Sequence, residues 1–503
     1  MKQGIQILLW LTCLLAVLAG IYVFRPHQLF FLADDFIHIP ESAHNLLNQR
    51  NSLRPVGNLS IHLDYLWSKK SPFGYHFTNL ILHLTNSFLV FIFCKILVKK
   101  YASLVGSTIF SVTVAIVFFT YPFHSESIFW IIGRSGMLGA LFTISALLFF
   151  LKRNRSWYFF IASLICFELA LLSYESSWIF PIIAMTFAYA DTRLKHSNNK
   201  VELIKIALIW FLFLLNLIIR LQVTGELFNA YDSGSILNFD IKELILNFFR
   251  LFFRTLLPPF VQTKYFVAAS IVALLIIALL IYILRMQKKI HLLFVLLSFS
   301  WLISYLPYLS LGIDTHGVEG GRYLYLPAVF FCTWLLYLLF LLLKKQWFVI
   351  VFFAITVGNF YWLFQARSYF IKAGAITKTT YSEINNWQQK HVLFLENLPQ
   401  YNRGAVIFRL GFEEGLNWLY PNIKTKIFIV STDDSDVRLR EHHEPDFKIV
   451  YHEAQQLLQV PFYLERDTTF AKTYRQVPAK HLLFVPGEDV WFSFSDSTLL
   501  ISK

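Results

Sequence analysis

The sequence predicts a mainly α-helical, polytopic membrane protein of about eleven spans with a small α+β domain at its C-terminal end. Three observations lead to this fold class. The 503 residues are 56% hydrophobic and 18% aromatic but only 15% charged, a composition typical of integral membrane proteins. Long apolar runs recur through residues 1–365. Residues 366–503 contain instead short β-like runs, separated by polar, Pro and Gly positions. We therefore expect two domains, 1–365 and 366–503.

Each predicted span is a run of roughly 20 mostly apolar residues, the length that crosses the hydrocarbon core of a bilayer. The first run fits either a membrane anchor or a cleaved signal peptide, because Leu18-Ala19-Gly20 weakly resembles a processing site. Two runs are short, so the total is approximate. The runs lie near 4–24, 75–98, 102–121, 127–151, 157–173, 175–190, 203–222, 264–284, 291–311, 323–343 and 347–365.

Basic residues predict the orientation of these spans. Lys or Arg clusters follow every even-numbered run, for example Lys99 and Lys100 after the second and Arg153 after the fourth. Such clusters mark cytoplasmic ends, so we expect a cytoplasmic N-terminus and an extracytoplasmic C-terminal domain. The net charge of +13 then reflects membrane topology, and we exclude nucleic acid as a partner.

The C-terminal domain is predicted from alternating short elements and contains no recognisable catalytic motif. A helix is expected near Glu413–Leu419. The β-like runs are Ala405–Leu410, Lys426–Ser431, Phe447–Tyr451 and Leu482–Val485.

Two adjacent acids, Asp34 and Asp35, come soon after the first apolar run, in the first outward loop. They could simply be a solvated pair or helix N-cap acids. Several arginines, however, fall on the same predicted side of the membrane. A carboxylate can take a proton from an acceptor hydroxyl while arginines neutralise the charge on a phosphate leaving group. The pattern therefore favours transfer of a sugar from a lipid phosphate.

Arg134 lies two turns inside the fourth run, where an ionised group needs an anionic partner. The candidates are Glu126, two turns away on the same helix face, and a bound phosphate.

The second run carries a polar stripe at helical spacing: His76, Asn79, His83 and Asn86. We expect Asn79 and Asn86 to form hydrogen bonds between helices, and we take His76 as a site candidate.

The stretch "FDIKELILNFFRLFFRTLLPPF" predicts an amphipathic helix lying along the membrane interface, with Arg250 and Arg254 at headgroup level. Two interpretations of this helix remain open, plain anchoring and guidance of a lipid phosphate.

An ordered series of motifs resembles the glycosyltransferase-C superfamily. The nearest likeness is to the transmembrane-and-tetratricopeptide O-mannosyltransferases and their bacterial relatives, although no tetratricopeptide array follows here. The resemblance implies a polyprenyl- or dolichyl-phosphate sugar donor, transfer with inversion and an outward-facing site. The motifs are "ADDF" at 33–36, "SLRPVGNLS" at 52–60, "YHFTNLILH" at 75–83, "PFHSESIFWIIGR" at 122–134, "LLSYES" at 171–176 and "RYLYLP" at 322–327.

The resemblance also assigns roles. Asp34 and Asp35 become the catalytic acidic pair, without a choice between them as the base. The acceptor hydroxyl would belong to a protein, a lipid or a polysaccharide. The implied substrate-binding residues are Arg54, His76, His124, Glu126, Arg134, Glu175, Arg322 and Tyr323.

No cofactor is predicted and no metal site is assigned. A divalent metal stays open because Asp35, His38 and Glu41 carry suitable ligand atoms. The alternative function is transport or flipping of lipid-linked sugars, but transporters hold their polar groups near the membrane midplane.

Overall fold

The computed structural model describes most of the chain. Its contacts divide the chain into two units: unit 1 contains residues 1–29, 41–230 and 236–369, and unit 2 contains residues 30–40, 231–235 and 370–503. The predicted division at residue 365 stays a prediction. The described residues are 18, 22–45, 53–102, 106–194, 199–225, 240–259, 263–286, 291–311, 317–388, 392–396, 398–423, 426–430, 440–441, 447–452, 457–463, 480–483, 490–495 and 498–502.

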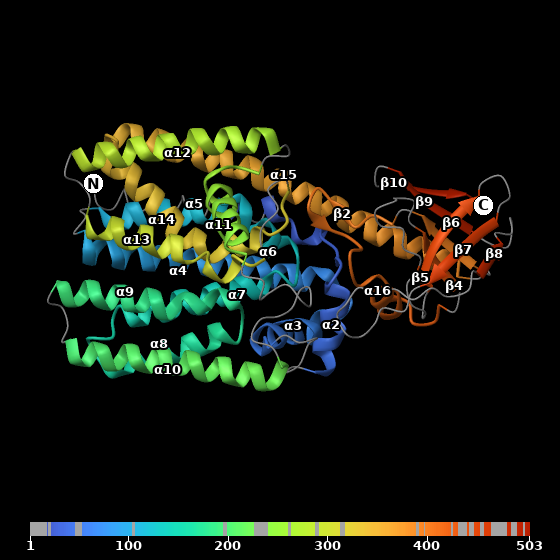
Figure 1. Cartoon of the computed structure of the whole chain (residues 1–503), viewed down its shortest axis with the longest axis horizontal. Helices are drawn as coiled ribbons and strands as arrows, with labels where there is room; N and C mark the ends of the chain where they lie inside the picture. Colours follow the sequence, from blue (N-terminus) through green and yellow to red (C-terminus); the bar gives the residue numbers. More distant parts are fainter. Residues whose placement is uncertain are drawn as a thin grey trace. The chain divides into compact units, whose positions relative to one another are not determined.

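Unit 1 is a helical bundle (Figure 1). Short 3-10 helices join several of its α-helices. The α-helices are α3 (Pro55–Ser68), α4 (Pro72–Tyr101), α5 (Ser107–Thr120), α6 (Ser125–Phe129), α7 (Arg134–Phe150), α8 (Trp157–Leu171), α9 (Phe180–Arg193), α10 (Asn199–Thr224), α11 (Ile241–Leu256), α12 (Thr263–Met286), α13 (Leu292–Ile303) and α14 (Tyr325–Leu342). The 3-10 helices are η1 (Pro26–Gln28), η2 (Pro122–His124), η3 (Glu175–Ile179), η4 (Leu306–Tyr308) and η5 (Gly321–Leu324). Two further helices, α2 (Asp35–His44) and α15 (Lys345–Asn386), have residues in both units.

The chain is a polytopic membrane protein, and its candidate spans are a subset of these helices. Five described helical segments are long and apolar enough to cross a bilayer, and a sixth is counted if α5 and the segment 122–129, bent by 51°, form one span. Three shorter apolar helices accompany them. The count of eleven stays a prediction, and most of the first run, 4–24, lies outside the described residues. The five segments are Pro72–Tyr101, Lys200–Thr224, Tyr265–Met286, Gly321–Leu342 and Lys345–Asn386.

The predicted run 127–151 is not one continuous helix, because the chain folds back between α6 and α7. A Cβ at Gly133 would lie 2.6 Å from the Glu126 carbonyl oxygen and 2.8 Å from the Ser127 Cα. Only glycine permits this approach. The break separates Glu126 from Arg134, so these residues do not share a helix face.

Polar side chains fix α4 in the middle of the bundle. The Asn79 side-chain amide donates to the Ile128 and Trp130 carbonyls, each at 3.2 Å, and that of Asn86 donates to the Met137 carbonyl at 2.9 Å. All three bonds join α4 to the α6–α7 segment. The expected interhelical role of the two asparagines is confirmed.

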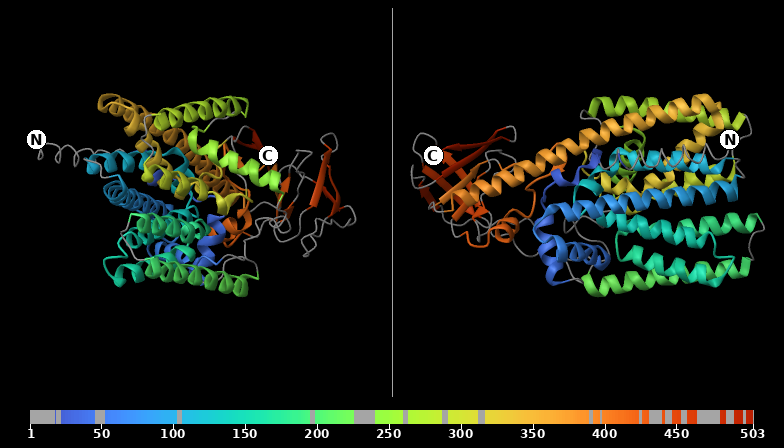
Figure 2. Two further views of the ribbon diagram at one scale, coloured as in Figure 1. Left: turned by 60° about the vertical axis from the view of Figure 1, so that its left-hand side comes forward. Right: turned by 180° about the vertical axis from the view of Figure 1, so that it is seen from behind.

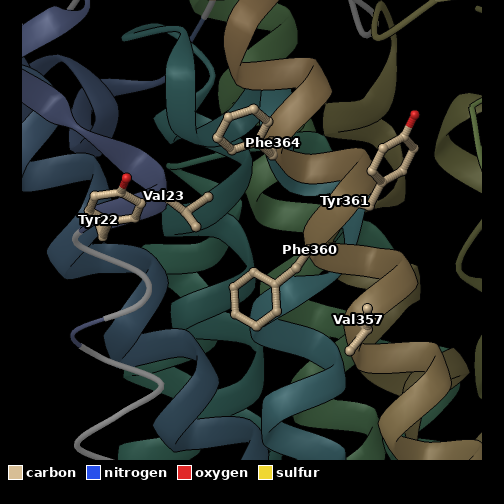
Figure 3. A pocket seen from close by; sticks show the side chains of 6 residues that line it. All are labelled: Tyr22, Val23, Val357, Phe360, Tyr361 and Phe364. Carbon is tan, nitrogen blue, oxygen red and sulfur yellow. The ribbon is translucent and has the colours of Figure 1, made fainter.

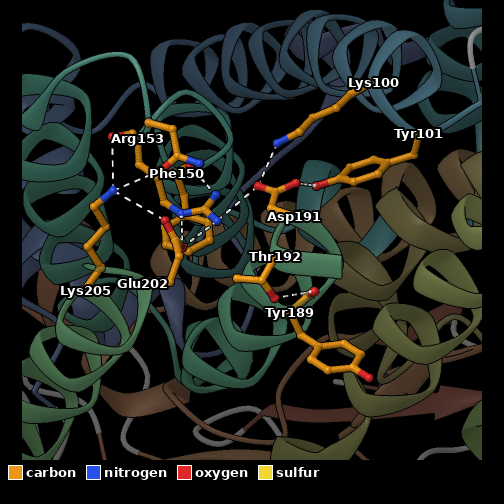
Figure 4. Close-up of polar contacts among 10 residues, drawn as sticks. Lys100, Tyr101, Phe150, Arg153, Tyr189, Asp191, Thr192, Glu202 and Lys205 are labelled. Atoms are coloured by element: carbon orange, nitrogen blue, oxygen red, sulfur yellow. Dashed lines mark hydrogen bonds and ion pairs between the residues drawn. The ribbon is translucent and has the colours of Figure 1, made fainter. Parts of the chain in front are cut away.

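A buried ion network ties one end of α4 to three other segments (Figure 4). Asp191 of α9 accepts from Lys100 and from Tyr101, each at 2.7 Å, and lies 3.0 Å from Arg153. Arg153 in turn contacts Glu202 of α10 at 2.6 Å. The basic ends that follow the second and fourth runs therefore lie together, while the membrane side that they face stays a prediction.

Helix α11 confirms the expected amphipathic helix and buries one of its arginines. Ile241 and Ile245 are exposed, whereas Arg254 is fully buried. Arg254 donates to the Gly317 carbonyl and stacks 4.6 Å from the centre of the Phe123 ring. Arg254 is therefore directed into the bundle, and Phe248 and Phe252 also pack on it, with ring centres 5.9 and 5.2 Å from those of Tyr305 and Trp301. The expected position of the helix at headgroup level stays a prediction.

Unit 2 is built on a mixed sheet. Strand β1 (Val392–Glu396) pairs in parallel with β4 (Lys426–Val430) and with β9 (Val490–Ser495). The edges are antiparallel: β10 (Thr498–Ser502) on β9 and β5 (Arg440–Glu441) on β4. The remaining strands are the hairpin β2 (Tyr401–Asn402) and β3 (Ala405–Val406), and the antiparallel set β6 (Phe447–His452), β7 (Leu457–Tyr463) and β8 (Lys480–Leu483).

Helix α16 (Phe412–Leu419) lies where a helix was predicted. The C-terminal part of α15 belongs to the same unit (Figure 2). This helix extends 21 residues past the predicted span end at 365, because Phe370, Ala373, Thr377 and Tyr381 continue a buried stripe at helical spacing.

Candidate active site

Glu175 is held between two arginines in unit 1. Arg54, which precedes α3, contacts the Glu175 carboxylate at 2.8 Å, and Arg220 of α10 contacts it at 2.9 Å. Glu175 lies on the 3-10 helix η3, outside the helices long enough to span. Burial alone raises the pKa of the Glu175 carboxyl, but the two guanidinium groups outweigh burial and hold the pKa below its ordinary value. Glu175 is therefore ionised.

A second pair joins Glu126 of α6 to Arg322 of η5. The Arg322 backbone N–H donates to the Glu126 carboxylate at 2.9 Å, and the Arg322 guanidinium pairs with the other carboxylate oxygen. The guanidinium also stacks over Trp130 and Tyr323, with its central carbon 5.2 and 4.8 Å from the ring centres. Backbone and side chain of Arg322 are thus both fixed by one buried acid.

Three tyrosines connect the two ion pairs. The Arg54 guanidinium lies 4.7 Å from the centre of the Tyr174 ring. Tyr174 and Tyr308 have their ring centres 6.3 Å apart, and Tyr308 stacks on Tyr323 at 4.8 Å. The Tyr323 hydroxyl accepts from Arg322 at 3.0 Å. Arg54, Glu175, Glu126 and Arg322 therefore form one continuous polar–aromatic assembly in unit 1.

Arg134, the first residue of α7, lies beside this assembly but pairs with another acid, Asp64. It is fully buried, contacts the Asp64 carboxylate at 2.5 Å and donates to the Tyr75 carbonyl at 2.8 Å. The expected candidate Glu126 is not its partner. Tyr75 is near the start of α4 and Tyr101 at its end, so this pair and the ion network of Asp191 are separated by about 39 Å of helix.

The histidines of the predicted site are buried. His83 lies between Tyr325 and the Phe119 backbone, at 2.7 and 2.9 Å. Because a carbonyl only accepts, the Nε2 atom of His83 donates to Phe119 and Nδ1 accepts from the Tyr325 hydroxyl. His124 packs 4.3 Å from the Tyr325 ring centre, and within the described residues neither of its ring nitrogens has a hydrogen bond of ordinary geometry. His76 is 1% exposed.

The segment that carries Asp34 and Asp35 belongs to unit 2. The Ala33 backbone N–H donates to the Ile407 carbonyl at 3.0 Å. Phe36 packs on Tyr381 with ring centres 5.1 Å apart. Residues of α15 and of the stretch after β3 therefore hold this segment in place.

The two aspartates differ in what they contact. Asp35 is fully buried, and its carboxylate accepts from the Leu32 backbone N–H at 2.9 Å. Asp34 is half-buried, and its Oδ1 atom is buried without a hydrogen bond among the described residues. Ala33, directly before it, has a left-handed φ of 42°, which is strained for a residue with a Cβ. Asp35 is thus bound into the local fold, whereas one Asp34 oxygen has no hydrogen bond among the described residues.

Three residues that contact predicted site residues, Arg220, Asp64 and Tyr308, were not themselves predicted. Arg220 left a signal, since it is an isolated charge near the end of the apolar run 203–222, whose other charged residue, Lys205, lies near the start. Asp64 and Tyr308 left none that identifies their partners. Among the described residues, no three His, Cys, Asp or Glu side chains gather as metal ligands would.

Parts of this chain are similar in sequence to curated proteins. Protein O-mannosyl-transferase TMTC3 of Homo sapiens is 31% identical over 105 residues, which are 21% of this chain and 10% of that protein. A Protein O-mannosyl-transferase of Caenorhabditis elegans is 24% identical over 206 residues, 41% of this chain and 27% of that protein. The chain is a distant relative of the O-mannosyltransferases. It matches only about a tenth of the length of the first of these relatives.

Two further comparisons concern solved structures and protein-family models. The crystal structure of ArnT from Cupriavidus metallidurans bound to undecaprenyl phosphate matches with a TM-score of 0.43 and 10% identity, over 86% of this chain and 87% of that one. No protein-family model matches the chain.

Proposed function

We propose that the chain is a membrane glycosyltransferase that moves a sugar from a polyprenyl-phosphate donor to an acceptor hydroxyl on the extracytoplasmic face, with inversion. The observation that carries this proposal is the relationship to O-mannosyltransferases. The arginine–carboxylate assembly of unit 1 supports it, because guanidinium groups are the side chains best suited to bind a phosphate in two-point fashion.

The degree of burial separates the arginines by role. The side chains of Arg54 and Arg322 are 13% and 11% exposed. Each still reaches the surface while an acid fixes its position, Glu175 for Arg54 and the buried Glu126 for Arg322. Arg134 and Arg220 are fully buried. We assign the donor phosphate to Arg54 and Arg322, and the positioning of that site to Arg134 and Arg220.

The lack of a hydrogen bond to Asp34 Oδ1 among the described residues supports the assignment of Asp34 as the base. Inverting transfer needs one carboxylate to take the acceptor proton as the hydroxyl attacks the anomeric carbon and the lipid phosphate leaves with the bonding electrons. Asp35 already accepts a backbone hydrogen bond in a fully buried position. Its role is to hold the turn that presents Asp34.

The test is sugar transfer in membranes that contain the full chain, with a panel of polyprenyl-phosphate sugars. Asp34→Asn keeps the size of the side chain but cannot accept the proton, so transfer should fall about a hundredfold to ten-thousandfold. Asp35→Asn should retain more activity than Asp34→Asn, because an amide oxygen can still accept from Leu32.

Glu383→Gln is the matched control, an acid-to-amide change on α15 in the same unit, and should transfer at the wild-type rate. Transfer by Asp34→Asn at that rate would refute the assignment of the base. If no donor is turned over while the chain moves intact lipid-linked sugars between leaflets, the protein is a flippase.

A further inference from the structure

An apolar groove in unit 1 shares no lining residue with the assembly described above. Its volume is about 440 Å³, and it runs between residues 22–23 and helix α15 (Figure 3). Tyr22, Tyr361 and Phe364 are 64%, 57% and 43% exposed, so three large rings of the groove face the outside of the bundle. The lining residues are Tyr22, Val23, Val357, Phe360, Tyr361 and Phe364.

Two arginines lie at one end of this groove, each over a lining ring. The Arg25 guanidinium is 4.6 Å from the centre of the Tyr22 ring, and that of Arg367 is 4.3 Å from the centre of the Phe364 ring. Arg367 donates to the Val23 carbonyl at 2.8 Å, so it also joins the two walls of the groove. Cationic groups and apolar rings thus meet at a single edge.

No carboxylate neutralises these arginines among the described residues. Arg367 is 5% exposed, and its Nε atom is buried without a hydrogen-bond partner. The two positive charges of Arg25 and Arg367, next to an apolar surface, favour the binding of an anion.

The dimensions match one leaflet of a bilayer. Between Val357 and Arg367, α15 rises about 15 Å, and half of a bilayer's hydrocarbon core is also about 15 Å thick. Tyrosine side chains favour the headgroup boundary, where Arg25 and Arg367 would also lie.

We propose that this groove binds an anionic phospholipid of the surrounding bilayer, with one acyl chain along Val357–Phe364 and the phosphate on Arg25 and Arg367. A bilayer lipid fits better than a reacting sugar carrier, because no carboxylate that could serve as a base lines the groove. The bound lipid joins residues 22–23 to α15 and so stabilises this edge of the bundle.

The test is native mass spectrometry of the full chain, purified with phosphatidylglycerol or with phosphatidylcholine. Wild type should retain one phosphatidylglycerol molecule after delipidation, with at least tenfold preference over phosphatidylcholine. Arg25→Gln, and Arg25→Gln combined with Arg367→Gln, should weaken phosphatidylglycerol binding about tenfold to hundredfold, because charge-assisted hydrogen bonds to the phosphate are lost. Val357→Trp should weaken it by filling the groove.

The matched control is Arg193→Gln. Arg193 also stacks on a tyrosine, 5.1 Å from the Tyr189 ring centre, but it does not line the groove. The Arg193→Gln variant should therefore bind phosphatidylglycerol as tightly as wild type does. Equal retention of the two phospholipids, or wild-type retention by the folded Arg25→Gln and Val357→Trp variants, would overturn the proposal. So would displacement of phosphatidylglycerol by equimolar polyprenyl phosphate, which would identify the occupant as the carrier.

Discussion

Replacing Asp64 by Asn should destabilise the bundle strongly. Asp64 is the acid that contacts Arg134 within the described part of the chain, and the two residues are 4% and 0% exposed. The substitution removes the negative charge and leaves a guanidinium buried in unit 1. The other Arg134 bonds, to Ser60 and to the Tyr75 carbonyl, are made to neutral groups.

The size of the effect follows from burial. Removing one partner of a buried ion pair costs about 3–5 kcal/mol. Asn retains an oxygen that can accept one hydrogen bond. We therefore expect the free energy of unfolding to fall by the lower end of this range, about 3 kcal/mol. Combining Asp64→Asn with Arg134→Met removes both charges. The double variant should therefore lose at least about 1 kcal/mol less free energy of unfolding than the two single variants lose together.

The assay is chemical unfolding of the purified protein in detergent micelles, followed by circular dichroism. Arg134→Lys, tested in parallel, keeps the charge but loses the planar fork, so it should lower stability as well. A wild-type free energy of unfolding for Asp64→Asn would refute the structural role of the pair. Normal stability of Arg134→Lys with selectively weakened donor use would return Arg134 to the phosphate-binding group.

Three other outcomes are expected. Gly411→Val should lower transfer and expose the acid segment to proteolysis, because Gly411 has a φ of 79° and a Cβ there would collide with the Ala33 carbonyl. Asp191→Asn should lower the thermal midpoint, since it removes an acid shared by two basic side chains, and transfer measured below the midpoint should persist. A topology reporter fused after Lys503 should read extracytoplasmic and one after Lys289 cytoplasmic; the opposite result at Lys503 would contradict the predicted orientation.

Hydrophobic length made the helices predictable. The run 75–98 became α4, and 264–284 became α12, because twenty apolar residues in a row leave few alternatives to a helix. Breaks were harder to predict. Gly133 looks like any glycine in an apolar run. Only its close approach to the Glu126 backbone shows why α6 and α7 are not one continuous helix.

Partners of charged residues could be predicted less well than their positions. Glu126 and Arg134 would share a helix face if α6 and α7 were continuous, but each finds a partner more than 50 residues away in sequence. The sequence shows that a buried charge needs a partner. It does not show which distant segment supplies that partner, since this depends on tertiary packing.

The hydrogen bond between Ala33 and Ile407 links positions that are about 370 residues apart. At a synthesis rate of about 5–20 residues per second, the ribosome needs roughly 20–75 s to reach the second after making the first. During that interval the acid-bearing turn lacks its partners in the later part of the chain. A nascent or prematurely terminated polypeptide therefore cannot complete this turn, and competence for catalysis would arise only once synthesis is nearly finished.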